Sequence, residues 1–185
     1  MGMFDGMNDG TIPTGGQRIY FSGGSYRVQV DVIKSIPAEE AFDGIPSYIA
    51  EVIVLQSDNP TLRTGAVVGW VEKLKKKTLR KSFANIKGFL AACMGVANEA
   101  DFAAMAANLG YHLGANGRQQ MQDGMPVIHY DRMASDMASE ANPLRGMVVD
   151  LVCTEKPKRD GDGVFTVHHW HPKGYLDEKF GVHGQ

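Results

Sequence analysis

The order of hydrophobic and polar residues predicts that the first part of the chain forms strands. Residues alternate from Ser25, with apolar Tyr26, Val28, Val30 and Val32 on one side of the chain and polar Arg27, Gln29 and Asp31 on the other. Alternation with a period of two is typical of a half-buried strand. Two further apolar runs, YIAEVIVLQ from Tyr48 and GAVVGWVEKL at 65–74, flank the turn sequence SDNP at 57–60, and residues of this kind separate strands. The pattern therefore predicts a meander of three strands.

The period then changes to that of a helix. Phe83, Ile86, Leu90 and Cys93 recur at spacings of three and four residues, which predicts an amphipathic helix over 79–94. A second helix is predicted over 98–113 with Asn98 as its cap, a loop over 114–127, and a third helix over 128–140. Strand patterns return at 146–155 and 163–172, and the connector KPKRDGDG between them has the Asp-Gly steps of a hairpin turn.

This order of elements predicts a mainly β fold with a helical insertion, in the α+β class. Five strands with a helix between the third and the fourth are the elements of an OB-type barrel, a partly open Greek-key barrel. Strands and helices do not alternate, so nothing requires a parallel sheet. We expect residues 1–24 to form a flexible arm, residues 25–172 to form the OB domain with its insertion at 98–142, and residues 173–185 to form a tail.

Composition and targeting signals narrow the class of protein. The chain has 185 residues, of which 43% are hydrophobic and 22% charged, as in an ordinary globular domain. The N-terminal segment MGMFDGMNDG has no basic part followed by an apolar stretch, and no long apolar run occurs elsewhere, which predicts a cytoplasmic protein without a membrane partner. Cys93 and Cys153 fall on apolar patterns, so we expect buried, reduced thiols.

Motifs that support catalysis are missing from the sequence. It contains no Gly-Lys dipeptide for a P-loop, no strand leading into GxGxxG, no HExxH, no paired CxxC and no GxSxG. We therefore expect no enzyme activity and no cofactor. His168, His169 and His171 surround Trp170, but in a strand only His169 and His171 share a side. A metal site would need a further ligand such as His129 or His183, so ordinary strand-end histidines are the favoured interpretation and we expect no metal.

Local charge is more informative than the net charge of -2. The segment KLKKKTLRK carries a run of cations without an acid: Lys73, Lys75, Lys76, Lys77, Arg80 and Lys81. A second basic cluster is Lys156, Lys158 and Arg159, in the connector between the last two strands. The alternative is that the lysine run is a solvated helix start that aids solubility. Cations in the first helical turn oppose the helix macrodipole, which weakens a purely structural interpretation.

Aromatic side chains complete a candidate surface for a single nucleic-acid strand, which is held by cations along its phosphates and by rings on which its bases stack. Trp70, Trp170 and Tyr48 are the candidate rings, and Arg27 and Gln29 are lesser candidate contacts. Trp70 shares a side of its strand with Glu72, which leaves open whether its ring is exposed or belongs to the core. Tyr26 is aligned with valines and is assigned to the core.

The segments GSYRVQVDVIKS, YIAEVIVLQSDNP, TGAVVGWVEKL, NIKGFLAACMGV and FTVHHWHP follow one another in an order that resembles the small OB-fold single-stranded DNA-binding proteins of bacteriophages. The resemblance covers residues 24–95 and 146–172. It implies largely sequence-independent binding of single-stranded DNA in phage replication or recombination, in the host cytoplasm, with RNA and a homo-oligomer left open. The rival hypotheses are a structural or assembly protein, such as a phage particle component, and an enzyme that uses the histidine strand.

Overall fold

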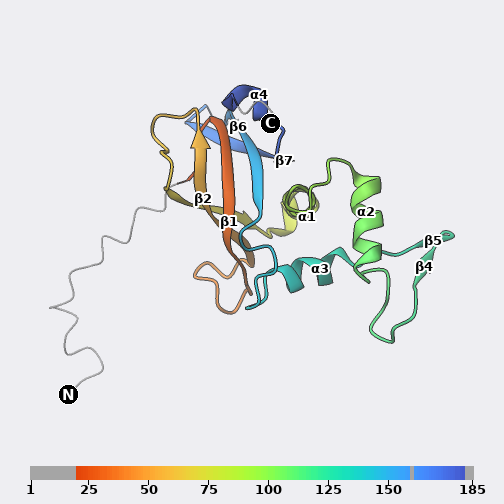
Figure 1. Cartoon of the computed structure of the whole chain (residues 1–185). Coiled ribbons are helices and arrows are strands. Elements are labelled where there is room, and N and C mark those ends of the chain that lie inside the picture. The colour runs from red at the N-terminus through yellow and green to blue at the C-terminus, as the bar shows by residue number, and fades with distance from the viewer. Residues whose placement is uncertain (1–19, 159–160, 182–185) are drawn as a thin grey trace, which may run out of the picture.

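The computed structural model describes residues 20–158 and 161–181. It shows one twisted sheet with a helix against it and a helical insertion that extends to one side (Figure 1). Most of the expected N-terminal arm, Arg159 and the last residues of the expected tail lie outside the described residues. At the near end of that arm, Phe21 is buried and packs on Tyr26 with 4.9 Å between ring centroids. Phe21 therefore belongs to the domain, although the sequence placed it in the arm.

The sheet is antiparallel throughout and has the strand order β3-β2-β1-β6-β7. Its strands are β1 (Gly24–Ile36), β2 (Ser47–Ser57), β3 (Val67–Lys73), β6 (Val148–Pro157) and β7 (Val164–Pro172). The predicted meander of three strands is confirmed, and so is the predicted hairpin of the last two. The sheet is not closed by hydrogen bonds between β3 and β7, which are its two edges, so the structure shows an antiparallel five-stranded sheet rather than a closed barrel.

After Val30, the buried and exposed positions of β1 no longer follow the predicted alternation. The pairing of β1 with β2 shifts register between Val30 and Val32, because Asp31 is an extra residue at a β-bulge. Beyond the bulge, Ile33 is fully buried and Val32 is only partly buried. The assignment of Val32 to the buried side was therefore wrong, since a bulge exchanges the two sides of a strand.

Helix α1 (Leu79–Cys93) covers the open side of the sheet between β3 and β7, and it is preceded by a short 3-10 turn, η1 (Lys76–Thr78). Phe89 of α1 is fully buried and lies 5.3 Å from Trp70 of β3 and 4.9 Å from Trp170 of β7, measured between ring centroids. The two tryptophans also meet directly, with 5.5 Å between their rings. Aromatic packing thus joins the two edges of the sheet where backbone pairing does not.

The insertion contains two helices and a small hairpin. Helix α2 (Glu99–Asn108) has the predicted cap, since Asn98 accepts a hydrogen bond from the backbone of Asp101 at 2.9 Å. It ends before residue 113, where the sequence placed its end, because Gly110 turns the chain with a φ of 87°. Helix α3 (Tyr130–Met137) is likewise shorter than predicted. The expected loop contains two-residue strands, β4 (Met121–Gln122) and β5 (Met125–Pro126).

The C-terminal segment is fastened to the sheet. Helix α4 (Asp177–Phe180) brings Asp177 within 2.6 Å of Arg27 on β1, and Arg27 also makes a two-bond ion pair with Asp150 on β6, at 2.7 and 2.9 Å. Asp150 is fully buried and accepts two backbone hydrogen bonds from residues 174 and 176. Beyond β7, residues 173–181 therefore form part of the folded domain.

Candidate nucleic-acid interface

A groove lies where the end of β3, the start of α1 and the middle of β7 meet. It has a volume of about 590 Å³ and three of the predicted lysines, Lys73, Lys75 and Lys81, are on its wall. Trp70, Asn85 and residues 166–168 form much of the rest. We call this feature the basic groove. It lies at the gap between the two edge strands, on the side of the sheet that α1 covers.

Two side-chain contacts hold the start of α1 against the end of β3 and so shape the basic groove. The Ser82 hydroxyl donates to the backbone oxygen of Lys73 at 3.1 Å, and the Asn85 amide donates to the Glu72 carboxylate at 2.9 Å. Ser82 is buried, so its hydrogen bond replaces water as the partner of that carbonyl. The lysine run that connects the end of β3 to the start of α1 is therefore held on a short bend rather than on an extended loop.

The lysines of the groove differ in how their charge is compensated. Lys73 is paired with Asp43, so its charge is largely neutralised. Lys75 and Lys81 are exposed, and neither forms an ion pair with another residue in the described part of the chain. Two uncompensated cations therefore remain at the groove, against the single carboxylate of Glu72 on its wall.

The second predicted basic cluster lies close to the first. Lys156 on β6 is paired in register with Phe165 on β7, and the Lys81 ammonium lies 5.9 Å from the centre of the Phe165 ring. Lys158 follows at the turn of the same hairpin and is exposed. The structure therefore brings Lys81 to the ring of Phe165, whose partner in the sheet is Lys156, although Lys81 and Lys156 are far apart in the sequence.

Several predicted contact residues lie in other surroundings. Trp70 and Tyr48 are only 3% and 4% exposed, and Arg27 is 6% exposed within its ion pairs. The expected exposure of Tyr48 and Arg27 was wrong, because Tyr48 faces α1 and Arg27 faces the C-terminal segment. Trp70, whose exposure the sequence left open, belongs to the core and packs on Phe89 of α1. Trp170 is half-buried within the aromatic cluster. Gln29 is partly exposed and donates to the backbone oxygen of Gly146, away from the groove.

Two exposed rings beside the lysines were not among the predicted residues. Tyr20 is 58% exposed on the wall of the basic groove, and Phe165 is 41% exposed at the end of β7. Alternation along β7 puts Phe165 on the side opposite Trp170, but the sequence alone does not show which of the two sides is exposed. Tyr20 had no alternation signal, because it lies in the segment assigned to the arm. Lys76, Lys77 and Arg80 are exposed but do not line the groove.

The described histidines and cysteines do not gather into a metal site, and both cysteines are buried. Burial, with a smaller contribution from His169, lowers the pKa of His168 to about 4, so this imidazole is neutral at neutral pH. His171 stacks on Tyr175. Within residues 20–158 and 161–181, no three or more histidine, cysteine or acidic side chains gather in a way that fits a metal ion. Both cysteines are buried as predicted, and burial raises the pKa of Cys153 to about 12.

No protein-family model and no curated protein matches this sequence. In the part of the chain that the structure describes, no helix has the length and apolar character needed to cross a membrane.

Proposed function

We propose that this protein binds single-stranded DNA, with little sequence preference, and catalyses no reaction on it. The observation that carries the proposal is the arrangement around the basic groove. The uncompensated cations Lys75 and Lys81 share the wall of the groove with the exposed ring of Tyr20. Lys81 also lies beside the exposed ring of Phe165, which is paired in register with Lys156 on the neighbouring strand. Cations that follow a backbone and rings that accept stacked bases are the two components of sequence-tolerant single-strand binding.

The strand order supports the finer proposal that the fold is an OB-type barrel. A Greek key has three consecutive antiparallel strands and a fourth that returns beside the first, in the order 4-1-2-3. Here β6, β1, β2 and β3 have this order, and β7 extends it at the edge. The contact between Trp70 and Trp170, with 5.5 Å between ring centroids, brings the edges of β3 and β7 together. OB folds bind oligonucleotides on such a partly open barrel.

The role that we propose is protection of single strands during phage replication or recombination. The resemblance of residues 24–95 and 146–172 to phage proteins of this class supports that role.

Salt dependence of oligo-dT binding tests this proposal. If three to six phosphates are neutralised, the slope of log K against log salt is about -2 to -4. We expect this slope in an anisotropy titration of labelled oligo-dT at several salt concentrations, and we expect duplex DNA of the same length to compete poorly. Lack of oligo-dT binding at low salt would show that the groove does not have this function.

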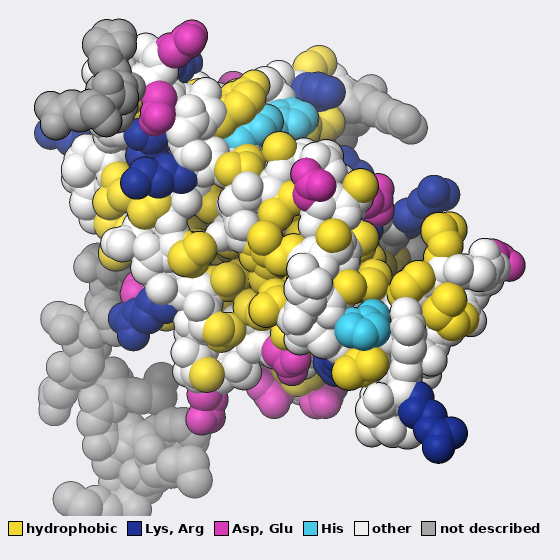
Figure 2. Space-filling view, turned by 45° about the vertical axis from the view of Figure 1, so that its right-hand side comes forward, with side chains coloured by type: hydrophobic (Ala, Val, Ile, Leu, Met, Phe, Trp, Pro, Cys, Tyr) yellow, Lys and Arg dark blue, Asp and Glu magenta, His cyan; other side chains and the backbone are white. Residues whose placement is uncertain are grey.

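A second candidate function is self-assembly, as in a structural protein, and exposed apolar side chains of the insertion favour it. The β4–β5 hairpin presents Met121 and Met125 at 58% and 68% exposure, and Figure 2 shows hydrophobic side chains gathered over the insertion side of the molecule. An apolar groove of about 440 Å³ between α1 and α3 contains Phe83 and Leu90. Methionine adapts well to such grooves. We propose that the hairpin of a second copy of this chain is the occupant.

Opposite charges near the two surfaces agree with that pairing. Arg118 is exposed just before the hairpin, and Asp131 lies on the wall of the apolar groove. A hairpin-to-groove contact joins different surfaces of two copies, so it forms either a reciprocal twofold dimer or, when it repeats head to tail, a ring or open filament.

Changing Met121 and Met125 to glutamate tests self-assembly in the absence of DNA. We expect the unchanged protein to sediment as assemblies whose size grows with concentration, and the double variant to sediment as a monomer, because a buried carboxylate opposes the contact. Changing the exposed residues Gln119 and Gln120 to glutamate adds the same charge beside the hairpin and serves as the control. A monomer at every concentration of the unchanged protein would exclude this candidate.

A further inference from the structure

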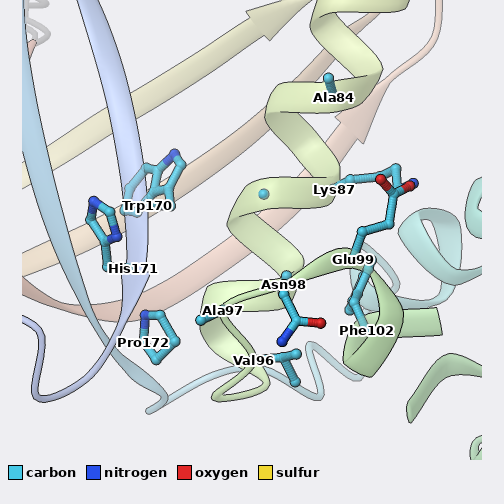
Figure 3. Close-up of a pocket in the computed structure, with 12 residues that line it drawn as sticks. Ala84, Lys87, Val96, Ala97, Asn98, Glu99, Phe102, Trp170, His171 and Pro172 are labelled. Carbon is cyan, nitrogen blue, oxygen red and sulfur yellow. The ribbon is translucent and has the colours of Figure 1, made fainter. Parts of the chain in front are cut away.

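A second cavity lies further along the seam between α1 and β7, beyond the basic groove, and we call it the seam pocket. It has a volume of about 300 Å³ and lies between α1, the start of α2 and the end of β7 (Figure 3). Cavities of this size are at the lower end of the range for small-molecule sites. The seam pocket can therefore hold a group about the size of a nucleoside, but not a helix or strand of another protein.

Small residues on α1 keep the seam pocket open. Ala84, Gly88 and Ala91 face it at helical spacing, and a Cβ atom built on Gly88 would meet no other atom within 4 Å. Glycine in the middle of a helix is unfavourable compared with alanine, and nothing packed against Gly88 requires its lack of a side chain. Trp170 lies on the opposite side of the pocket, as Figure 3 shows, and its ring is held by Trp70 and Phe89.

The polar groups at the seam pocket suit an uncharged ligand. Lys87 and Glu99 both line it, and they are paired with each other at 2.7 Å. Their charges cancel, so the pocket lacks the uncompensated cations of the basic groove. His171 also lines it, and burial, followed by the influence of His169, lowers the pKa of this imidazole. A neutral imidazole offers one donor and one acceptor nitrogen, which is the kind of partner that the edge of a heteroaromatic ring requires.

The seam pocket and the basic groove lie one after the other along the same two elements, α1 and β7. On α1, Lys81 and Asn85 line the groove and Ala84 and Gly88 line the pocket, and residues at this three- and four-residue spacing form one stripe on a helix. On β7, residues 166–168 line the groove and residues 170–172 line the pocket. Lys81 and Gly88 are about 10 Å apart along the helix axis at 1.5 Å per residue, a distance that a few nucleotides cover.

We propose that the seam pocket receives one base of a single strand whose phosphates lie in the basic groove. The proposal rests on the function proposed above and adds to it a specific site for an uncharged planar heteroaromatic ring. The pocket adds one enclosed base contact to the exposed rings of Tyr20 and Phe165, whereas the lysines of the groove account for phosphate contacts. The protein therefore has separate sites for the two parts of a nucleotide.

Gly88→Leu tests the seam pocket, because leucine fills the cavity and also favours the helix. The probe is oligo-dT, with an abasic oligonucleotide of equal length and charge beside it. A stacked base contributes about 1–3 kcal/mol, which corresponds to about five- to 150-fold in affinity. We expect Gly88→Leu to weaken oligo-dT binding within that range, to leave abasic binding unchanged, and to keep the salt slope. Ala104→Leu, at an exposed position of α2 outside the pocket, is the matched control and should bind as the unchanged protein does.

The possible outcomes distinguish failure of the seam-pocket proposal from failure of the proposed single-stranded DNA binding. If the unchanged protein does not bind oligo-dT at low salt, both proposals fail. If it binds and Gly88→Leu binds equally well, the seam pocket is empty in the complex and only this inference fails. A shallower salt slope in Gly88→Leu would place a phosphate there and would overturn the assignment to a base. Ala84→Leu fills the same stripe and gives the same test if Gly88→Leu lowers the melting temperature.

Discussion

Asp150→Ala is expected to destabilise the protein by about 3–5 kcal/mol, because it removes one partner of a buried ion pair and leaves the other uncompensated. Asp150 is fully buried and Arg27 is 6% exposed. The carboxylate accepts two hydrogen bonds from Arg27, at 2.7 and 2.9 Å, and two backbone hydrogen bonds from residues 174 and 176. Urea denaturation followed by circular dichroism measures the change, and the C-terminal segment should become accessible to protease before the sheet does.

Removal of both partners of the ion pair provides the control. In Arg27→Met with Asp150→Leu no buried charge is left unpaired, so we expect a substantial part of the lost stability to return. A free energy of unfolding for Asp150→Ala within about 1 kcal/mol of the unchanged protein, the range of an ordinary substitution, would show that this ion pair does not hold the C-terminal segment in place.

The same ion pair predicts the sign of a pH effect. Burial of Asp150 opposes its ionisation, but hydrogen bonds from Arg27 and from the backbone outweigh that effect and hold the pKa of Asp150 below its ordinary value. A carboxyl group with a lowered pKa stabilises the fold above its unfolded-state pKa of about 3.9, and this stability is lost as the pH falls through the folded-state pKa. The stability difference between the unchanged protein and Asp150→Asn should therefore shrink below about pH 4.

Loss of Lys75 and Lys81 on the wall of the basic groove, and of Lys156 beside them on the β6–β7 hairpin, is expected to weaken oligo-dT binding by about 100-fold at 0.1 M salt. On a single strand, each neutralised phosphate contributes about 0.7 to the salt slope, which corresponds to about five-fold in affinity at 0.1 M relative to 1 M salt. The variant changes Lys75, Lys81 and Lys156 to glutamine. All three side chains are exposed, so the fold should remain intact. Anisotropy titrations should also show a slope that is shallower by about 2.

A control variant with the same net charge distinguishes DNA binding at the basic groove from a general attraction of DNA to the positive charges of the protein. Lys76, Lys77 and Lys173 are exposed and do not line the basic groove, and their change to glutamine lowers the net charge by the same amount. We expect this control to lose much less affinity. Equal losses in the two variants would mean that DNA responds to overall charge and that the groove is not its site. Lys73 is left unchanged in both variants because it is paired with Asp43.

Much of the fold was predictable from local patterns. The five long strands and α1 were placed within a few residues, because period-two and period-3.6 alternation records which side of each element is buried. Asn98 was recognised as a helix cap because its role is local to its own turn. The bulge at Asp31 was missed, since a register shift depends on the neighbouring strand and leaves no mark in the sequence of its own strand.

The candidate site was only partly predictable. The sequence by itself determined that cations concentrate at 73–81 and 156–159, and that aromatic residues lie on neighbouring strands. Only the tertiary structure decided which of these cationic and aromatic side chains are exposed at the surface and can contact a ligand. Packing against α1 buried Trp70 and Tyr48, ion pairs buried Arg27, and the approach of β7 to α1 placed Phe165 beside Lys81. The reason is that exposure and proximity depend on contacts between segments distant in sequence, which alternation within one segment does not encode.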